Sequence, residues 1–197
     1  MKKIFTALVI ALISIAIISA QEYKHSFGVI AGSFNGISYK LRPYENFAFQ
    51  LDLGVSINQT PFGKATYRYG GLKLPITEEA PVVNACYQIQ PNIMWQGELT
   101  DNFYLFAGGG VTAGFLWLNA DVWTHTGYHV QLENQSEAKY GVNGIVGFEY
   151  CWAETPLTLG FDFRPGYGAE YDHVTSDISY HRQYFDWSLS LALRYNF

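Results

Sequence analysis

Apolar and polar residues alternate along most of this chain, which restricts the folds open to it more than any other feature. Residues 47–57 read FAFQLDLGVSI, and residues 157–164 (LTLGFDFR) and 187–197 (WSLSLALRYNF) repeat the same pattern. Successive side chains of a β-strand point to opposite faces, so a period of two gives each strand one apolar and one polar face. The chain is therefore predicted to be all-β.

Eight strands are predicted, at about 26–33, 36–42, 47–57, 83–98, 103–116, 140–150, 157–167 and 184–197. Short turns at 42–46, 99–102 and 151–156 alternate with long polar connections at 58–82, 117–139 and 168–183, and an Asn35–Gly36 turn is expected to close the first hairpin. An even number of strands with short turns on one side is the plan of bacterial outer-membrane proteins. We expect an eight-stranded antiparallel transmembrane β-barrel with short periplasmic turns and three long extracellular loops.

Charged residues avoid the apolar face of every predicted strand. Those within strands all have the other parity: Lys40, Arg42, Asp52, Glu98, Glu149, Asp162, Arg164 and Arg194. A charge facing lipid at mid-depth costs about 2–4 kcal/mol, so a membrane barrel requires this exclusion. A secreted soluble barrel with an apolar cavity is the alternative, and it would place charges on its outer face.

The first twenty residues have the composition of a signal peptide. Lys2 and Lys3 precede an apolar stretch over residues 4–18, and Ser19 and Ala20 offer a cleavage site. We expect residues 1–20 to be removed and residues 21–197 to form the barrel domain; a retained N-terminal anchor is the alternative. Loss of the two lysines takes the formal net charge from −5 to −7, which argues against a nucleic-acid partner.

The ending LSLALRYNF (residues 189–197) resembles the last strand of outer-membrane proteins, and the chain is similar in plan to the small OmpA and OmpX type of barrel in the porin-like superfamily. The resemblance implies that Tyr195 and Phe197 belong to a signal read by the barrel-assembly machinery. It also implies a place in the outer membrane of a Gram-negative bacterium, in contact with membrane lipid and lipopolysaccharide.

Motifs for catalysis or cofactor binding are weak. Residues 108–113 (GGGVTA) match a dinucleotide fingerprint but lie within a predicted strand, without the helix that the fingerprint needs. His125 and His129 have metal-ligand spacing only on a helix, and none is predicted there. We expect no catalytic residue, metal or cofactor. A narrow channel for small solutes and a lipid A-modifying barrel enzyme remain as alternatives.

The predicted interior and the long loops give two candidate functional regions. Five inward charges are expected to form a network that plugs the lumen: Asp52, Glu149, Asp162, Arg164 and Arg194. Aromatic residues distant from the predicted strands, Tyr69, Trp123 and Tyr128, are the candidate contacts for a ligand or another surface protein. The expected function is a non-enzymatic structural or binding role exerted through the extracellular loops.

Overall fold

The computed structural model describes residues 24–56, 65–69, 72–75, 82–123, 129–175 and 178–197, which form ten antiparallel strands. Their bounds are β1 His25–Gly32, β2 Phe34–Tyr44, β3 Phe47–Ser56, β4 Ala65–Tyr69, β5 Leu72–Pro75, β6 Val82–Thr100, β7 Phe103–Trp123, β8 His129–Cys151, β9 Leu157–Thr175 and β10 Ile178–Asn196. None of the described residues belongs to a helix long and apolar enough to cross a membrane.

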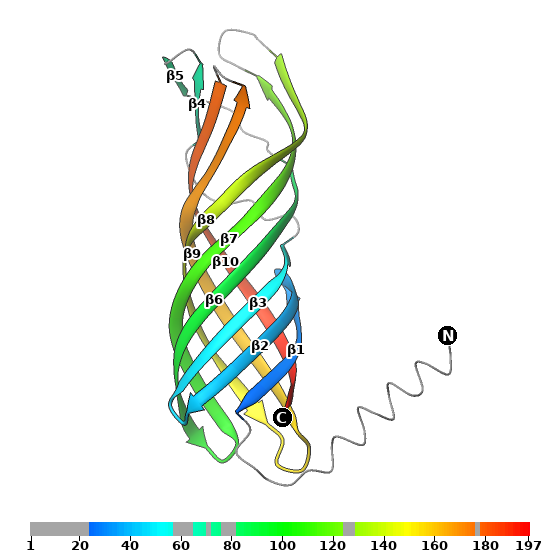
Figure 1. The fold of residues 1–197 in the computed structure, drawn as a ribbon, viewed down its shortest axis with the longest axis vertical. Coiled ribbons are helices and arrows are strands. Elements are labelled where there is room, and N and C mark those ends of the chain that lie inside the picture. The colour runs from blue at the N-terminus through cyan, green and yellow to red at the C-terminus, as the bar shows by residue number, and fades with distance from the viewer. Residues whose placement is uncertain (1–23, 57–64, 70–71, 76–81, 124–128, 176–177) are drawn as a thin grey trace, which may run out of the picture.

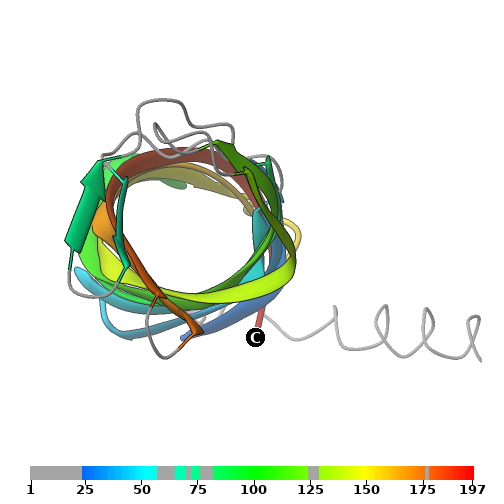
Figure 2. The same cartoon turned by 90° about the horizontal axis from the view of Figure 1, so that it is seen from above.

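Eight of these strands close into a barrel in the order β1-β2-β3-β6-β7-β8-β9-β10. β1 pairs with β10 to complete the ring, with Phe27 opposite Tyr195 and Val29 opposite Leu193. Figure 2 looks along the axis of this ring of strands. The predicted eight-stranded antiparallel barrel is therefore confirmed.

The barrel has two unlike ends. We call the end that holds the C-terminus and the short connections after β2, β6 and β8 the turn end. At the opposite end, which we call the loop end, β6 to β10 extend past the shorter β1, β2 and β3 (Figure 1). β7 and β8 contain 21 and 23 residues, against 8 in β1. The prediction that residues 117–139 and 168–183 are loops was wrong in extent, because strands occupy 117–123, 129–139, 168–175 and 178–183. Polar residues such as Asn119, Ser136 and His173 occupy the parity that is apolar in the rest of the strand, so alternation does not reveal these extensions.

The predicted loop at 58–82 also contains strand structure. β4 pairs with the outer part of β10, with Tyr67 opposite Tyr180, and β5 pairs with β4. β10 therefore has β1 beside it near the turn end and β4 beside it at the loop end.

The first hairpin turns at Gly32, so the expected Asn35–Gly36 turn was wrong. Gly32 has a φ of 149°, which favours glycine, whereas Gly36 lies within β2 opposite Ile30. The Asn35 side chain closes the turn by accepting from the Gly32 N–H at 3.1 Å and donating to the Gly32 carbonyl at 2.9 Å. The side chain of Asn35 thus fixes a turn that the dipeptide pattern had placed later in the chain.

The outside of the barrel is apolar and the inside is polar. On the outer face Ile93 is 53% exposed and Leu191 52%, whereas their inward neighbours Asn92 and Ser190 are buried. Among the residues whose side-chain exposure the structure describes, the exposed charged ones lie near the turn end: Lys24, Glu45, Glu98, Asp101 and Glu154. This arrangement reverses the usual distribution of a water-soluble protein.

Candidate functional site in the barrel lumen

Among the described residues, two groups of buried ions lie in the lumen, each assembled from distant strands, and a separate, partly buried pair joins Lys139 of β8 to Asp186 of β10 at 2.8 Å. We call Asp52, Asp162 and Arg164 the mid-lumen cluster, and Lys40, Arg42, Glu149 and Arg194 the turn-end cluster. Eight strands enclose a space just wide enough for side chains, so inward residues meet across the barrel.

Arg164 of β9 is the centre of the mid-lumen cluster. Its Nε and Nη2 donate to the two carboxylate oxygens of Asp162 at 2.7 and 2.9 Å, and its Nη1 donates to Asp52 Oδ2 of β3 at 2.6 Å. The side chains of Arg164, Asp162 and Asp52 are only 2%, 1% and 0% exposed. Gln50 also donates to Asp52, at 2.8 Å to Oδ2. Charge-assisted bonds of this kind offset part of the cost of burying three ions.

Glu149 of β8 is the centre of the turn-end cluster. Its Oε1 accepts from Lys40 Nζ at 2.8 Å and from Arg42 Nη2 at 2.7 Å, both on β2. Arg194 Nη1 of β10 lies 3.6 Å from Glu149 Oε2, and Arg194 Nε donates to Ser38 Oγ at 3.1 Å. Three cations thus surround one carboxylate. Their mutual repulsion makes Glu149 the residue on which this cluster depends.

Aromatic rings provide further favourable contacts for two of these three cations. Lys40 Nζ lies 4.9 Å from the ring centroid of Phe106, and the Arg42 guanidinium lies 5.9 Å from that of Tyr104. The negative face of an aromatic ring attracts a cation, more strongly where water is excluded. Phe106 belongs to a buried apolar group with Ala48, Met94 and Ile145, which fills this part of the lumen.

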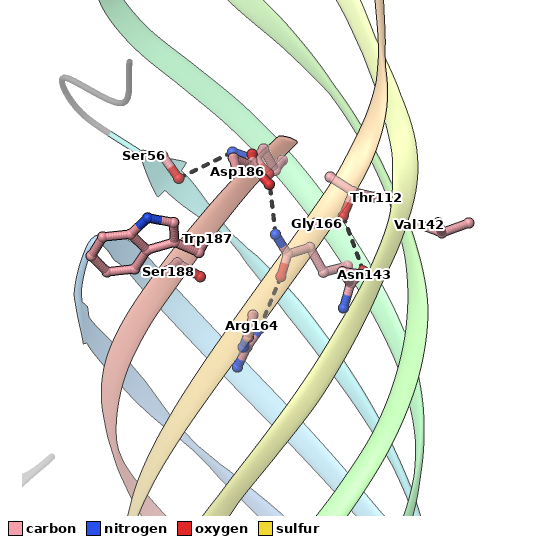
Figure 3. Close-up of a pocket in the computed structure, with 11 residues that line it drawn as sticks. Ser56, Thr112, Val142, Asn143, Arg164, Gly166, Asp186, Trp187 and Ser188 are labelled. Carbon is pink, nitrogen blue, oxygen red and sulfur yellow. Dashed lines mark hydrogen bonds between the residues drawn. The ribbon is translucent and has the colours of Figure 1, made fainter. Parts of the chain in front are cut away.

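On the loop side of the mid-lumen cluster, side-chain amides continue the polar interior. Arg164 Nη1 also donates to Gln90 at 2.9 Å, Gln90 donates to Gln88 at 3.1 Å, and Gln88 donates to Ser56 at 3.0 Å. These residues line a cavity of about 20 Å³ that Thr112 and Asn143 also border (Figure 3). A polar cavity of this volume has room for about one water molecule.

The five predicted network residues are all buried in the lumen, but the structure divides them between the two clusters. Asp52, Asp162 and Arg164 are in direct contact, whereas Glu149 and Arg194 belong to the other group. Lys40 and Arg42 complete the turn-end cluster and were not in the predicted set. Their inward parity was visible in the sequence, but their partner Glu149 lies 109 and 107 positions away.

The other predicted residues lie at chain or strand ends. Tyr69 ends β4 and Trp123 ends β7, while Tyr128 lies outside the described residues. Tyr195 is opposite Phe27 in the closing strand pair, and Phe197 exchanges backbone hydrogen bonds with His25. Among the described residues, no group of three or more His, Cys, Asp or Glu is placed to hold a metal ion.

Comparison with known proteins adds little to this description. No protein-family model matches the chain, and no curated protein matches it. Among solved structures the chain is similar to Neisserial surface protein A, with 15% identity over 88% of this chain and 93% of that one, and a TM-score of 0.40. At this level of likeness, nothing about ligand, partner or activity passes from that protein to this chain.

Proposed function

We propose that the chain is a non-enzymatic outer-membrane barrel that is anchored in lipid, plugged by its own side chains, and binds a partner through its extracellular strands. The observation that carries this proposal is the reversed polarity of the barrel, with apolar side chains outside and buried ion pairs inside. In lipid every backbone group must be bonded within the protein, and a closed barrel achieves this without a free edge.

Two belts of aromatic residues support a membrane position. Tyr44, Trp95, Tyr150 and Trp152 are exposed near the turn end, and Tyr87, Phe115, Tyr140, Tyr167 and Trp187 are exposed towards the loop end. Aromatic side chains of this kind gather at the two interfaces of membrane barrels. We place the turn end in the periplasm and the loop end outside the cell. Cleavage of residues 1–20, which lie outside the described residues, belongs to the same proposal.

The two ion clusters and the side chains between them support a plugged lumen. Arg164 joins β9 to β3, and Glu149 joins β8 to β2, so both ties cross the space that a solute would need. Steady conduction would require these buried pairs to separate, which leaves uncompensated charges in a region of low dielectric. We therefore favour a barrel with a plugged lumen over a narrow channel for small solutes.

Recognition is assigned to the strands that continue beyond the aromatic belts. The β7–β8 and β9–β10 hairpins extend past the barrel wall formed by β1, β2 and β3, and the β4–β5 hairpin joins the outer part of β10 (Figure 1). Hydrogen-bonded strands lose less conformational entropy on binding than irregular loops do. Tyr69 and Trp123, at the ends of β4 and β7, and Tyr128 are the proposed contact residues.

The test is to shorten these hairpins without altering the membrane part. Replacing residues 121–131 by a two-residue turn keeps the pairing of Trp117 with Ser136, and replacing 171–181 keeps that of Tyr184 with Gly168. Both barrels should assemble, and at least one should lose a protein that co-purifies with the intact chain in mild detergent. If both variants assemble and retain every co-purifying protein, recognition does not reside in these hairpins.

A further inference from the structure

Two backbone ladders are interrupted in one part of the barrel wall. Between β6 and β7 the pairing passes from Ile89 opposite Ala113 to Asn92 opposite Gly110, and the two pairs between them are missing. Between β8 and β9 it passes from Asn143 opposite Gly166 to Val146 opposite Phe163, again without the two intervening pairs. The β7–β8 ladder between these gaps is continuous, with Gly109 opposite Gly144. A short part of the β7–β8 hairpin, residues 107–114 and 140–147, is thus bounded by a gap on each side, and we call it the β7–β8 segment.

A proline lies in each gap. Pro91 is in β6 and Pro165 is in β9, and proline has no N–H to contribute to a ladder. The neighbouring glycines allow close approach, because a Cβ on Gly110 would overlap the Pro91 carbonyl oxygen and one on Gly144 would lie 3.3 Å from Pro165 Cγ.

Side chains in the lumen connect the strands at the level of the gaps. Gln90 and Arg164 immediately precede the two prolines, and Arg164 Nη1 donates to Gln90 Oε1 at 2.9 Å. This bond ties β6 to β9 behind the β7–β8 segment.

A second set of bonds joins β6, β7 and β8. Asn92 Nδ2 donates to the backbone carbonyl of Gln90 at 3.0 Å, and Asn143 Nδ2 donates to Asn92 Oδ1 at 2.6 Å. Thr112 Oγ1 donates to Asn143 Oδ1 at 3.0 Å. These three bonds connect the lumen sides of β6, β7 and β8 at the level of the gaps.

We propose that Arg164 and Gln90 form a brace across the lumen that holds the β7–β8 segment in place between the two ladder gaps. When the Arg164–Gln90 bond is lost, this segment opens before any other part of the membrane wall. This segment has fewer ladder bonds to break than neighbouring segments. A polar cavity of about 20 Å³ lies on its lumen side, and the side chains that line this cavity can form hydrogen bonds with the backbone groups released by opening.

The brace can be loosened without unpairing the ions. Gln90→Met removes the acceptor of Arg164 Nη1 but leaves the bonds of Arg164 to Asp52 and Asp162. Gln96→Met is the matched control, since Gln96 is a buried glutamine of the same strand, lies nearer the turn end, and donates to the Glu45 carbonyl at 3.3 Å. Both substitutions keep the length of an unbranched side chain.

The measurement is amide hydrogen exchange of the full chain in lipid vesicles, followed in peptides covering residues 107–114 and 140–147. In Gln90→Met, exchange in both peptides should be about tenfold faster than in the unaltered chain, while β1 to β3 stay protected. Gln96→Met should leave both peptides unchanged. Adding Pro91→Val to Gln90→Met restores an N–H to the β6–β7 ladder and should slow exchange again in residues 107–114.

Three results would overturn the brace. One is equal exchange in Gln90→Met and the unaltered chain. Another is acceleration of the same size in Gln96→Met. The third is acceleration spread evenly over all eight strands, which would show general destabilisation in place of local opening.

Discussion

The aromatic ring of Phe197 stacks on the imidazole of His25, with ring centroids 5.8 Å apart and planes inclined by 16°. The same two residues exchange backbone hydrogen bonds, from His25 N to Phe197 O at 3.2 Å and from Phe197 N to His25 O at 2.8 Å. His25 Nδ1 also lies 2.7 Å from the Tyr39 hydroxyl oxygen. The last residue of the chain is therefore built into the seam at which the barrel closes.

Deletion of Phe197 should greatly reduce the amount of barrel in the outer membrane, because it removes both the terminal aromatic of the predicted assembly signal and two seam hydrogen bonds. His25→Ala is the control that loses the ring stack, worth about 0.5–1.5 kcal/mol, but keeps Phe197. It should insert at normal levels and melt at a slightly lower temperature. Immunoblots of outer-membrane fractions compare the amounts of each variant. Equal levels of the deletion variant and the unaltered chain would show that assembly does not need Phe197.

Arg164→Met should destabilise the barrel by about 3–5 kcal/mol, because two carboxylates lose their shared cation. A triple variant that adds Asp52→Asn and Asp162→Asn removes the stranded charges and should recover much of that loss. Urea unfolding in lipid vesicles gives the free energies of unfolding. If the Arg164→Met variant is at least as stable as the triple variant, the pairing of these ions does not determine the stability of the barrel.

Glu149→Gln should also be strongly destabilising, since it leaves Lys40, Arg42 and Arg194 without a counter-charge in the turn-end cluster. Adding Lys40→Met removes one of the repelling cations and should restore part of the stability. A double-mutant cycle over these two positions measures the coupling between them, expected to exceed about 1 kcal/mol. Additive effects of the two substitutions would contradict the cluster.

The outer face should tolerate a charge only near its ends. Ile93→Arg, between the belt residues Tyr87 and Trp95 of β6, should cost about 2–4 kcal/mol, whereas Leu99→Arg near the turn end should cost about 0–1 kcal/mol. Both residues are exposed in the structure, so packing inside the barrel does not distinguish them. Unfolding from vesicles compares the two, and equal costs would argue that residue 93 does not face lipid.

Much of the fold is predictable from the sequence because one rule holds along the strands of the barrel wall, with apolar side chains outside and polar ones inside. The parity of Asp52 and Arg164 was enough to place both inside, and the charge-free face was enough to indicate a barrel with lipid outside. The alternation of apolar and polar residues does not reveal the full length of the long strands. In the outer parts of β7 to β10 the apolar parity also carries polar residues, so these parts were predicted to be loops.

The contacts within the lumen are harder to predict than its composition. Lys40 and Glu149 meet only because the sheet closes, and their separation of 109 residues leaves no local trace of the pairing. The brace between Arg164 and Gln90 depends on the height at which each strand crosses the wall, which the register sets and the alternation does not. The same limit explains why one predicted network is two clusters in the structure.

The most direct test of a closed barrel in the outer membrane combines membrane fractionation with gel mobility before and after heating. A closed barrel resists detergent until it is boiled, because it has no free edge from which to unravel. The chain should be found in the outer-membrane fraction and should migrate differently in the heated and unheated samples. A chain recovered from the soluble fraction, with the same mobility before and after boiling, would contradict the account.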